Sequence, residues 1–218
     1  MDHNKMPFKM MMLTKCVNAW MRPEVYYEND SVQGNRLKEP CVIICNHMRA
    51  ADGCIPKFLF PRDEVASLMA EDIMEWPIVN GLARSFGCIP INRRRPSAQW
   101  LKESLIRLNN GDSVAIFPEG TTLKDPKIVD FKPGFVMLAK KANVKILPVA
   151  LSGPYRSFQK NQLRIMVGTP TALAINGTTK EELQRECRRF RSIVCGMHAQ
   201  LNALDHVNGQ AHCCPKRA

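Results

Sequence analysis

The sequence predicts an α/β fold, a single-domain sandwich in which helices flank a largely parallel or mixed central sheet. Short apolar runs alternate with longer segments whose apolar residues recur at helical spacing, and this alternation is typical of α/β proteins. The run at 41–45, CVIIC, is the clearest strand because it is short, continuously apolar and followed at once by polar residues. With 218 residues, 45% of them hydrophobic, the chain is long enough to bury one sizeable core.

The remaining strands are expected where apolar or β-branched runs end in turn residues. We place them at 24–27, 64–69, 87–91, 112–117, 144–151 and 162–167. The run at 87–91 contains Pro90, and it suits an edge or terminal position because proline cannot donate a hydrogen bond to a neighbouring strand.

Helices are expected between these strands, where apolar residues form stripes and capping residues mark the ends. They are predicted at 5–22, from Asp52 to about Phe60, at 71–86 with a break at Pro77, from a cap at Ser97 to a stop at Asn110-Gly111, at 134–142, and from about Thr179 to Leu204. In the last of these, the apolar stripe faces the core and most arginines lie away from it.

The chain divides into an N-terminal segment (1–30), a main domain (31–205) and a loose C-terminal tail (206–218). The helix at 5–22 is basic and carries Met and Trp residues, so it either lies in a membrane interface or packs on the domain. No apolar run approaches the roughly 18 residues that a membrane span requires. We therefore expect neither a transmembrane span nor a signal peptide.

The net charge of +11 favours an anionic partner, whether a phosphate group, a membrane surface or nucleic acid. A nucleic-acid partner is disfavoured, because no recognisable binding motif is present and aromatic residues, at 7%, are too sparse for a stacking platform. Several of the nine cysteines lie in apolar runs, where they are expected to be reduced core residues. Reduced cysteines favour a protein at the cytosolic face of a membrane.

Polar residues follow three of the predicted strands, and the carboxyl ends of parallel strands gather at one edge of a sheet. These residues are Asn46-His47 with Asp52, then Asn92-Arg93, then Glu119-Gly120-Thr121. Such an edge would offer an imidazole base oriented by a carboxylate, a guanidinium that grips a phosphate, and a glycine turn whose amides face an oxyanion. The combination favours acyl transfer to the hydroxyl of an anionic acceptor.

The same residues fall in motifs that resemble those of the glycerolipid acyltransferases, typified by bacterial 1-acylglycerol-3-phosphate acyltransferase. The motifs are NHMRAAD at 46–52, GCIPINR at 87–93, FPEGT at 117–121 and ILPVAL at 146–151, with FKPG at 131–134 and VGTP at 167–170. The resemblance covers roughly 41–170, and FPEGT is its most specific single motif.

The resemblance implies transfer of a fatty acyl group from acyl-CoA or acyl-carrier protein to the free hydroxyl of a lysophospholipid. The expected acceptor is 1-acylglycerol-3-phosphate, and the product would be phosphatidate. His47 would be the general base and Asp52 would orient it. The implied substrate-binding residues are Arg93, which would bind the acceptor phosphate, with Asn46, Glu119, Gly120, Thr121 and Pro148. The resemblance implies no metal, no cofactor beyond the acyl thioester, and a peripheral location at a membrane.

Two positions depart from the family pattern. Arg49 stands where the family usually has serine, and Thr122 stands where FPEGT usually continues with arginine. These departures leave open another lysolipid acceptor, such as one with a larger head group or a lyso-aminolipid. Arg49 or Lys124 could supply the missing positive charge.

Three alternatives to this enzyme class are also open. A hydrolase or thioesterase is disfavoured, because no G-x-S-x-G motif occurs and Cys45 lies in an apolar run. A basic membrane- or nucleic-acid-binding module without catalysis is the second alternative. The third is a metal or palmitoylation site in the His- and Cys-bearing C-terminal tail.

Overall fold

In the computed structural model, the residues described are 22–29, 37–75, 77–92, 97–121, 128–153 and 162–211, together with Met12 and Ala19. Most of the helix predicted at 5–22 therefore lies outside the described residues. Arg93, Thr122 and Lys124 also lie outside them, as do residues 212–218 of the tail.

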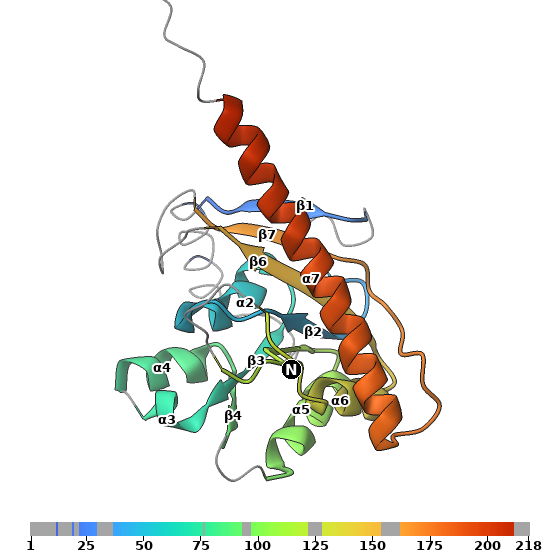
Figure 1. The fold of residues 1–218 in the computed structure, drawn as a ribbon. Helices are drawn as coiled ribbons and strands as arrows, with labels where there is room; N and C mark the ends of the chain where they lie inside the picture. The colour runs from blue at the N-terminus through green and yellow to red at the C-terminus, as the bar shows by residue number, and fades with distance from the viewer. Residues whose placement is uncertain are drawn as a thin grey trace, which may run out of the picture.

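A mixed sheet forms the centre of the domain, and seven strands belong to it among the described residues (Figure 1). They are β1 (Glu24–Tyr27), β2 (Cys41–Cys45), β3 (Val65–Ala70), β4 (Ile89–Ile91), β5 (Ser113–Ile116), β6 (Lys145–Ser152) and β7 (Arg164–Val167). Their spatial order is β1-β7-β6-β2-β5-β3-β4. All neighbouring strands are parallel except β6 and β7, which are antiparallel. The predicted mixed, largely parallel sheet is confirmed, and β4 with Pro90 is an edge strand as expected.

Strand β2 occupies the middle of the sheet because all five of its residues are apolar and buried. Val42 and Ile44 belong to the apolar cluster on one face, whereas Ile43 and Cys45 belong to the cluster on the other. A strand covered on both faces needs such a continuously apolar sequence. The end of β2 is therefore enclosed by neighbouring elements, and the candidate site begins at its next residue.

Helices cover both faces of this sheet (Figure 1). Helices that follow β2 in the chain include the 3₁₀-helix η2 (Ala50–Cys54), α2 (Ile55–Leu59), α3 (Glu71–Met74), α4 (Pro77–Ser85), α5 (Gln99–Asn109), α6 (Gly134–Ala142) and α7 (Lys180–Ala211). Residues of α5, α6 and α7 pack in the same cluster as Val42, and residues of α2 pack with Ile43. Within the described part of the chain, no helix combines the length and the apolar composition needed to cross a bilayer.

The ends of α6 and α7 follow simple capping rules. Thr179 Oγ1 accepts the Glu182 N–H at 3.2 Å and Glu182 Oε2 accepts the Thr179 N–H at 3.1 Å, which is a reciprocal capping box at the start of α7. Helix α6 ends at Asn143, whose φ of +53° is the left-handed conformation typical of helix ends. Both helices begin near their predicted positions.

Three local predictions were wrong. Asp52 is not the first residue of its helix but lies inside η2, which leads into α2, and its carboxylate turns back toward the N–H groups of Met48 and Arg49. The N-cap of α5 is Ala98 rather than Ser97. Helix α7 continues past Leu204 to Ala211, so residues 206–211 of the predicted loose tail are helical.

Pro148 lies within the strand predicted at 144–151, which is the interior strand β6, opposite Ile44 of β2. Its carbonyl oxygen accepts the Gly168 N–H at 2.9 Å on the side of β6 away from β2. In an extended strand, the N–H and C=O of one residue point to the same side. The missing N–H of Pro148 therefore removes no hydrogen bond to β2.

Candidate active site

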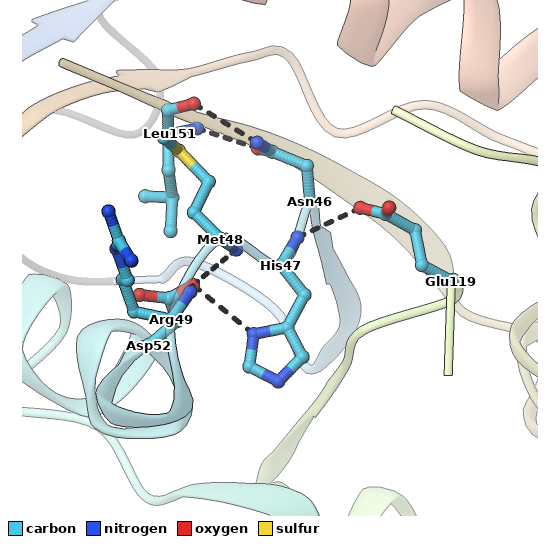
Figure 2. Close-up of polar contacts among 7 residues, drawn as sticks. All are labelled: Asn46, His47, Met48, Arg49, Asp52, Glu119 and Leu151. Carbon is cyan, nitrogen blue, oxygen red and sulfur yellow. Dashed lines mark hydrogen bonds and ion pairs between the residues drawn. The ribbon is translucent and has the colours of Figure 1, made fainter. Parts of the chain in front are cut away.

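His47 and Asp52 form a hydrogen-bonded pair just after β2 (Figure 2). His47 Nδ1 lies 3.2 Å from Asp52 Oδ2. The same oxygen accepts the main-chain N–H groups of Met48 at 2.6 Å and Arg49 at 2.7 Å. Asp52 is fully buried, and these donors compensate the loss of hydration around its charge. With Nδ1 donating to Asp52, Nε2 of the neutral imidazole has a free lone pair that can accept a proton.

Glu119 holds the other side of the His47 main chain (Figure 2). Its Oε1 accepts the His47 N–H at 2.9 Å, and its Oε2 accepts the Val129 N–H at 3.4 Å. The side chain is buried, and burial raises the pKa of the Glu119 carboxyl, an effect that these main-chain donors partly oppose. Glu119 thus joins the β2 end to the chain segment around 129 and fixes the histidine backbone.

The Asn46 side chain is held by the main chain of Leu151 in β6. Its amide donates to the Leu151 carbonyl at 3.0 Å and accepts the Leu151 N–H at 2.7 Å, as Figure 2 shows. The side chain is buried, and both ends of the amide are used by one main-chain residue of β6. Asn46 therefore ties the end of β2 to β6 and positions the adjacent histidine.

His47 lines a pocket of about 250 Å³ at the carboxyl ends of β3, β4 and β5. Most of its wall is apolar: Leu68, Ala70, Ile91, Trp100, Ile116, Phe117 and Phe135. The Phe117 ring lies against the imidazole, with 4.4 Å between ring centroids. The pocket therefore offers a histidine base at the edge of an apolar hollow, an arrangement suited to a substrate with an alkyl chain.

Gly120 leaves room for the amine of Lys132 at this pocket. Its φ is +69°, and a Cβ atom at this position would come within 2.7 Å of Lys132 Nζ. Both residues line the pocket together with His47. The absent side chain thus makes room for the lysine amine beside the Phe117–Gly120 turn. The N–H of Gly120 donates to the Phe117 carbonyl at 3.0 Å, so this amide closes the turn itself.

Three further residues singled out in the sequence, Thr121, Pro148 and Arg49, do not line the pocket around His47. Thr121 is exposed at the turn after Gly120, and Pro148 is not among the residues that line the pocket. The Arg49 guanidinium points away from the His47 ring (Figure 2). Lys132 is the residue that we missed, although it belongs to the FKPG motif at 131–134; that motif was the signal that could have identified it.

Cys45 does not have the surroundings of a nucleophile. Its side chain is buried in the apolar cluster with Ile43 and Leu59. Burial raises the pKa of its thiol well above the usual range, and the nearby charges of Asp52 and Glu119 act in the same direction. Among the described residues, no group of three His, Cys, Asp or Glu side chains could hold a metal ion.

The fold is that of an acyltransferase domain. The sequence model of the family Acyltransferase matches residues 22–152, and the chain belongs to this family. The crystal structure of the 1-acyl-sn-glycerophosphate (LPA) acyltransferase PlsC from Thermotoga maritima has the same fold, with a TM-score of 0.66 over 89% of this chain and 79% of that chain, at 24% identity.

Two curated relatives carry names that specify an acceptor. A 1-acyl-sn-glycerol-3-phosphate acyltransferase of Cocos nucifera is 31% identical over 141 residues, 62% of this chain and 45% of that protein. A lyso-ornithine lipid O-acyltransferase of Pseudomonas aeruginosa is 28% identical over 122 residues, 56% of this chain and 46% of that protein. The chain thus spans about half the length of these relatives.

Proposed function

We propose that this protein transfers a fatty acyl group from an acyl thioester to the free hydroxyl of a lysophospholipid, with 1-acylglycerol-3-phosphate as the acceptor. The observation that carries this proposal is the His47–Asp52 pair at the edge of an apolar pocket that also contains the Lys132 amine. The family membership and the name of the Cocos nucifera relative support the same reaction.

In this reaction, His47 Nε2 takes the proton of the acceptor hydroxyl as its oxygen attacks the thioester carbonyl. The Asp52 carboxylate stabilises the imidazolium that forms. Collapse of the tetrahedral intermediate breaks the carbon–sulfur bond, and the imidazolium returns the proton to the departing thiolate. The products are an ester and a free thiol, and no acyl-enzyme is needed.

The apolar wall of the pocket receives the alkyl chain, because burying apolar surface contributes roughly 25 cal/mol per Å². Lys132 supplies positive charge beside the reacting groups, where it can bind the acceptor's anionic group or stabilise the developing oxyanion. The motif resemblance assigns the acceptor phosphate to Arg93 as well. The peripheral membrane location fits the basic charge of the chain, +11, because anionic lipid surfaces attract basic proteins.

A lyso-aminolipid acceptor is the second candidate. Two observations favour it: Thr122 replaces the usual arginine of the FPEGT motif, and one relative is named a lyso-ornithine lipid O-acyltransferase. The two candidates share the chemistry of His47 and differ in the acceptor lipid.

The test is to incubate purified protein with acyl-CoA or acyl-carrier protein and a panel of lysolipids, and to follow the acylated product by mass spectrometry. We expect transfer to lysophosphatidate by the wild type, and its loss in His47→Ala. His198→Ala is a matched control, because this second histidine contacts Asn202 of the same helix, away from the pocket. Transfer only to a lyso-aminolipid would change the acceptor, and equal activity of His47→Ala would overturn the mechanism.

A further inference from the structure

A second hollow lies beside the chain segment that precedes α6. It has a volume of about 790 Å³ and is lined by the segment around Phe131 and by the first turns of α7. Figure 1 shows α6 and the N-terminal part of α7 side by side. We call this hollow the α7 groove.

Positive charge dominates the α7 groove. Four cations line it, namely Lys132, Lys180, Arg188 and Arg191, against the single carboxylate of Asp130. Arg191 is occupied, because it donates to the carbonyls of Ile128 and Val129 and lies 3.6 Å from Asp130 Oδ1. Lys180 and Arg188 are exposed and have no ion-pair partner among the described residues, so their charges can be met by an anionic ligand.

The inner surface of the α7 groove is apolar. Phe131 and Cys187 are buried, Leu183 is partly buried, and all three line the groove. A ligand that combines a flat apolar ring with several phosphates would use both features, since the ring can pack on the inner surface while the phosphates meet the cations.

The α7 groove and the pocket at the candidate active site share one lining residue. Lys132 lines both the groove and the pocket that contains His47. The two hollows therefore adjoin at Lys132, and a ligand with a long flexible arm would run from the groove past this residue toward the histidine.

We propose that the α7 groove binds the phosphorylated nucleotide end of coenzyme A, with its pantetheine arm passing Lys132 toward His47. This inference rests on the proposed function, because it assigns a site to the acyl donor of that reaction. A carrier protein is the less suitable occupant, since a hollow of this size is in the range of about 300–1,000 Å³ that small-molecule sites occupy.

The variant Lys180→Glu/Arg188→Glu tests the proposal, with coenzyme A itself as the binding probe in calorimetry. We expect its Kd and the KM for palmitoyl-CoA to rise at least about tenfold, since two attractive charges become repulsive. Transfer from palmitoyl-pantetheine, which lacks the nucleotide, should be unchanged. The control Lys102→Glu/Lys141→Glu alters the net charge equally at exposed positions of α5 and α6, and it should bind coenzyme A like the wild type.

Two results would overturn the α7 groove as the nucleotide site. One is an unchanged Kd for coenzyme A in Lys180→Glu/Arg188→Glu, and the other is a wild type that binds no coenzyme A and uses only acyl-carrier protein. Neither result affects the proposed function, provided that transfer persists. Conversely, charge-dependent coenzyme A binding in a protein that transfers from no donor would support the groove and overturn the proposed function.

Discussion

The Nδ1 atom of His47 lies 3.2 Å from Oδ2 of Asp52, and that same oxygen accepts the main-chain N–H groups of Met48 and Arg49. The carboxylate therefore fixes the histidine ring and the backbone beside it at once. An interaction of this kind leaves the imidazole with one orientation and one useful tautomer. We therefore expect the activity of the site to depend on this oxygen as much as on the histidine.

Asp52→Asn separates these two functions of Asp52. An asparagine oxygen can still accept the two main-chain N–H groups, but its amide cannot stabilise an imidazolium. We expect kcat to fall by roughly 10²–10⁴, the range for loss of general acid–base catalysis, while the melting temperature changes little. The measurement is steady-state kinetics with product detection by mass spectrometry. A variant with normal kcat would show that Asp52 only supports the loop.

Gly120→Ala tests the space beside Lys132. A φ of +69° is costly for alanine, and its Cβ would lie 2.7 Å from Lys132 Nζ. We expect the free energy of unfolding to fall by about 1–2 kcal/mol and the KM for the acceptor to rise as the amine moves. Urea denaturation and kinetics measure the two effects.

Gly81→Ala is the matched control for this substitution. Gly81 lies in α4 with nothing within 4 Å of a Cβ at that position, so alanine should leave the KM unchanged and stabilise the protein by up to about 1 kcal/mol. Equal effects of the two substitutions would contradict a specific role for the glycine at 120.

The strands of this fold follow from local sequence, but the order of the strands does not. The apolar run at 41–45 identifies β2 as a strand covered on both faces, because a strand with one solvated face would alternate polar and apolar residues. By contrast, nothing in the residues of β7 reveals that it runs antiparallel to β6 and pairs with β1. Such pairings are set by contacts between segments far apart in the chain.

The same distinction applies to the candidate site. His47 and Asp52 are five residues apart, so their contact could be predicted from spacing and from motif resemblance. Glu119 was expected near the substrate, yet its carboxylate binds the main chain of a residue 72 positions earlier. Lys132 was overlooked because a lysine in a loop acquires its role only when a glycine turn lies beside it.

Glu119→Gln tests the electrostatics of this buried carboxylate. Burial raises the pKa of Glu119 in the folded protein, so the folded state holds the proton more tightly than the unfolded chain does. The contribution of Glu119 to stability is therefore complete below the ordinary glutamate pKa and is lost as pH rises through the folded pKa. Glutamine does not titrate. The stability difference, wild type minus variant, should fall as pH increases above about 4.3.

Urea denaturation of both proteins across the acidic to neutral range measures this difference. A difference that increases with pH would mean that the hydrogen bonds from His47 and Val129 outweigh the cost of burial, which is the opposite of the expected sign. A difference independent of pH would show that Glu119 does not titrate differently in the folded and unfolded states.

Cys45→Ala distinguishes an acyltransferase from a thiol-dependent hydrolase. Since burial keeps the Cys45 thiol protonated by raising its pKa, we expect kcat to stay within about threefold of the wild type, an effect of less than about 1 kcal/mol. Iodoacetamide should leave Cys45 unmodified in the folded protein, as peptide mass spectrometry can show. Loss of turnover in the alanine variant at unchanged stability would favour the thiol mechanism.

Trp100→Ala tests whether the apolar pocket receives the acyl chain. The Trp100 ring lies in the pocket wall, with Cη2 3.3 Å from a Cβ built on Gly134, and its removal deepens the hollow. We therefore expect the preference in a mixture of acyl donors to move to longer chains, because each additional buried methylene contributes about 0.8 kcal/mol. Ile106→Ala is the control, since Ile106 is 51% exposed on the same helix, α5. A chain-length profile that moves equally in both variants, or in neither, would place the acyl chain elsewhere.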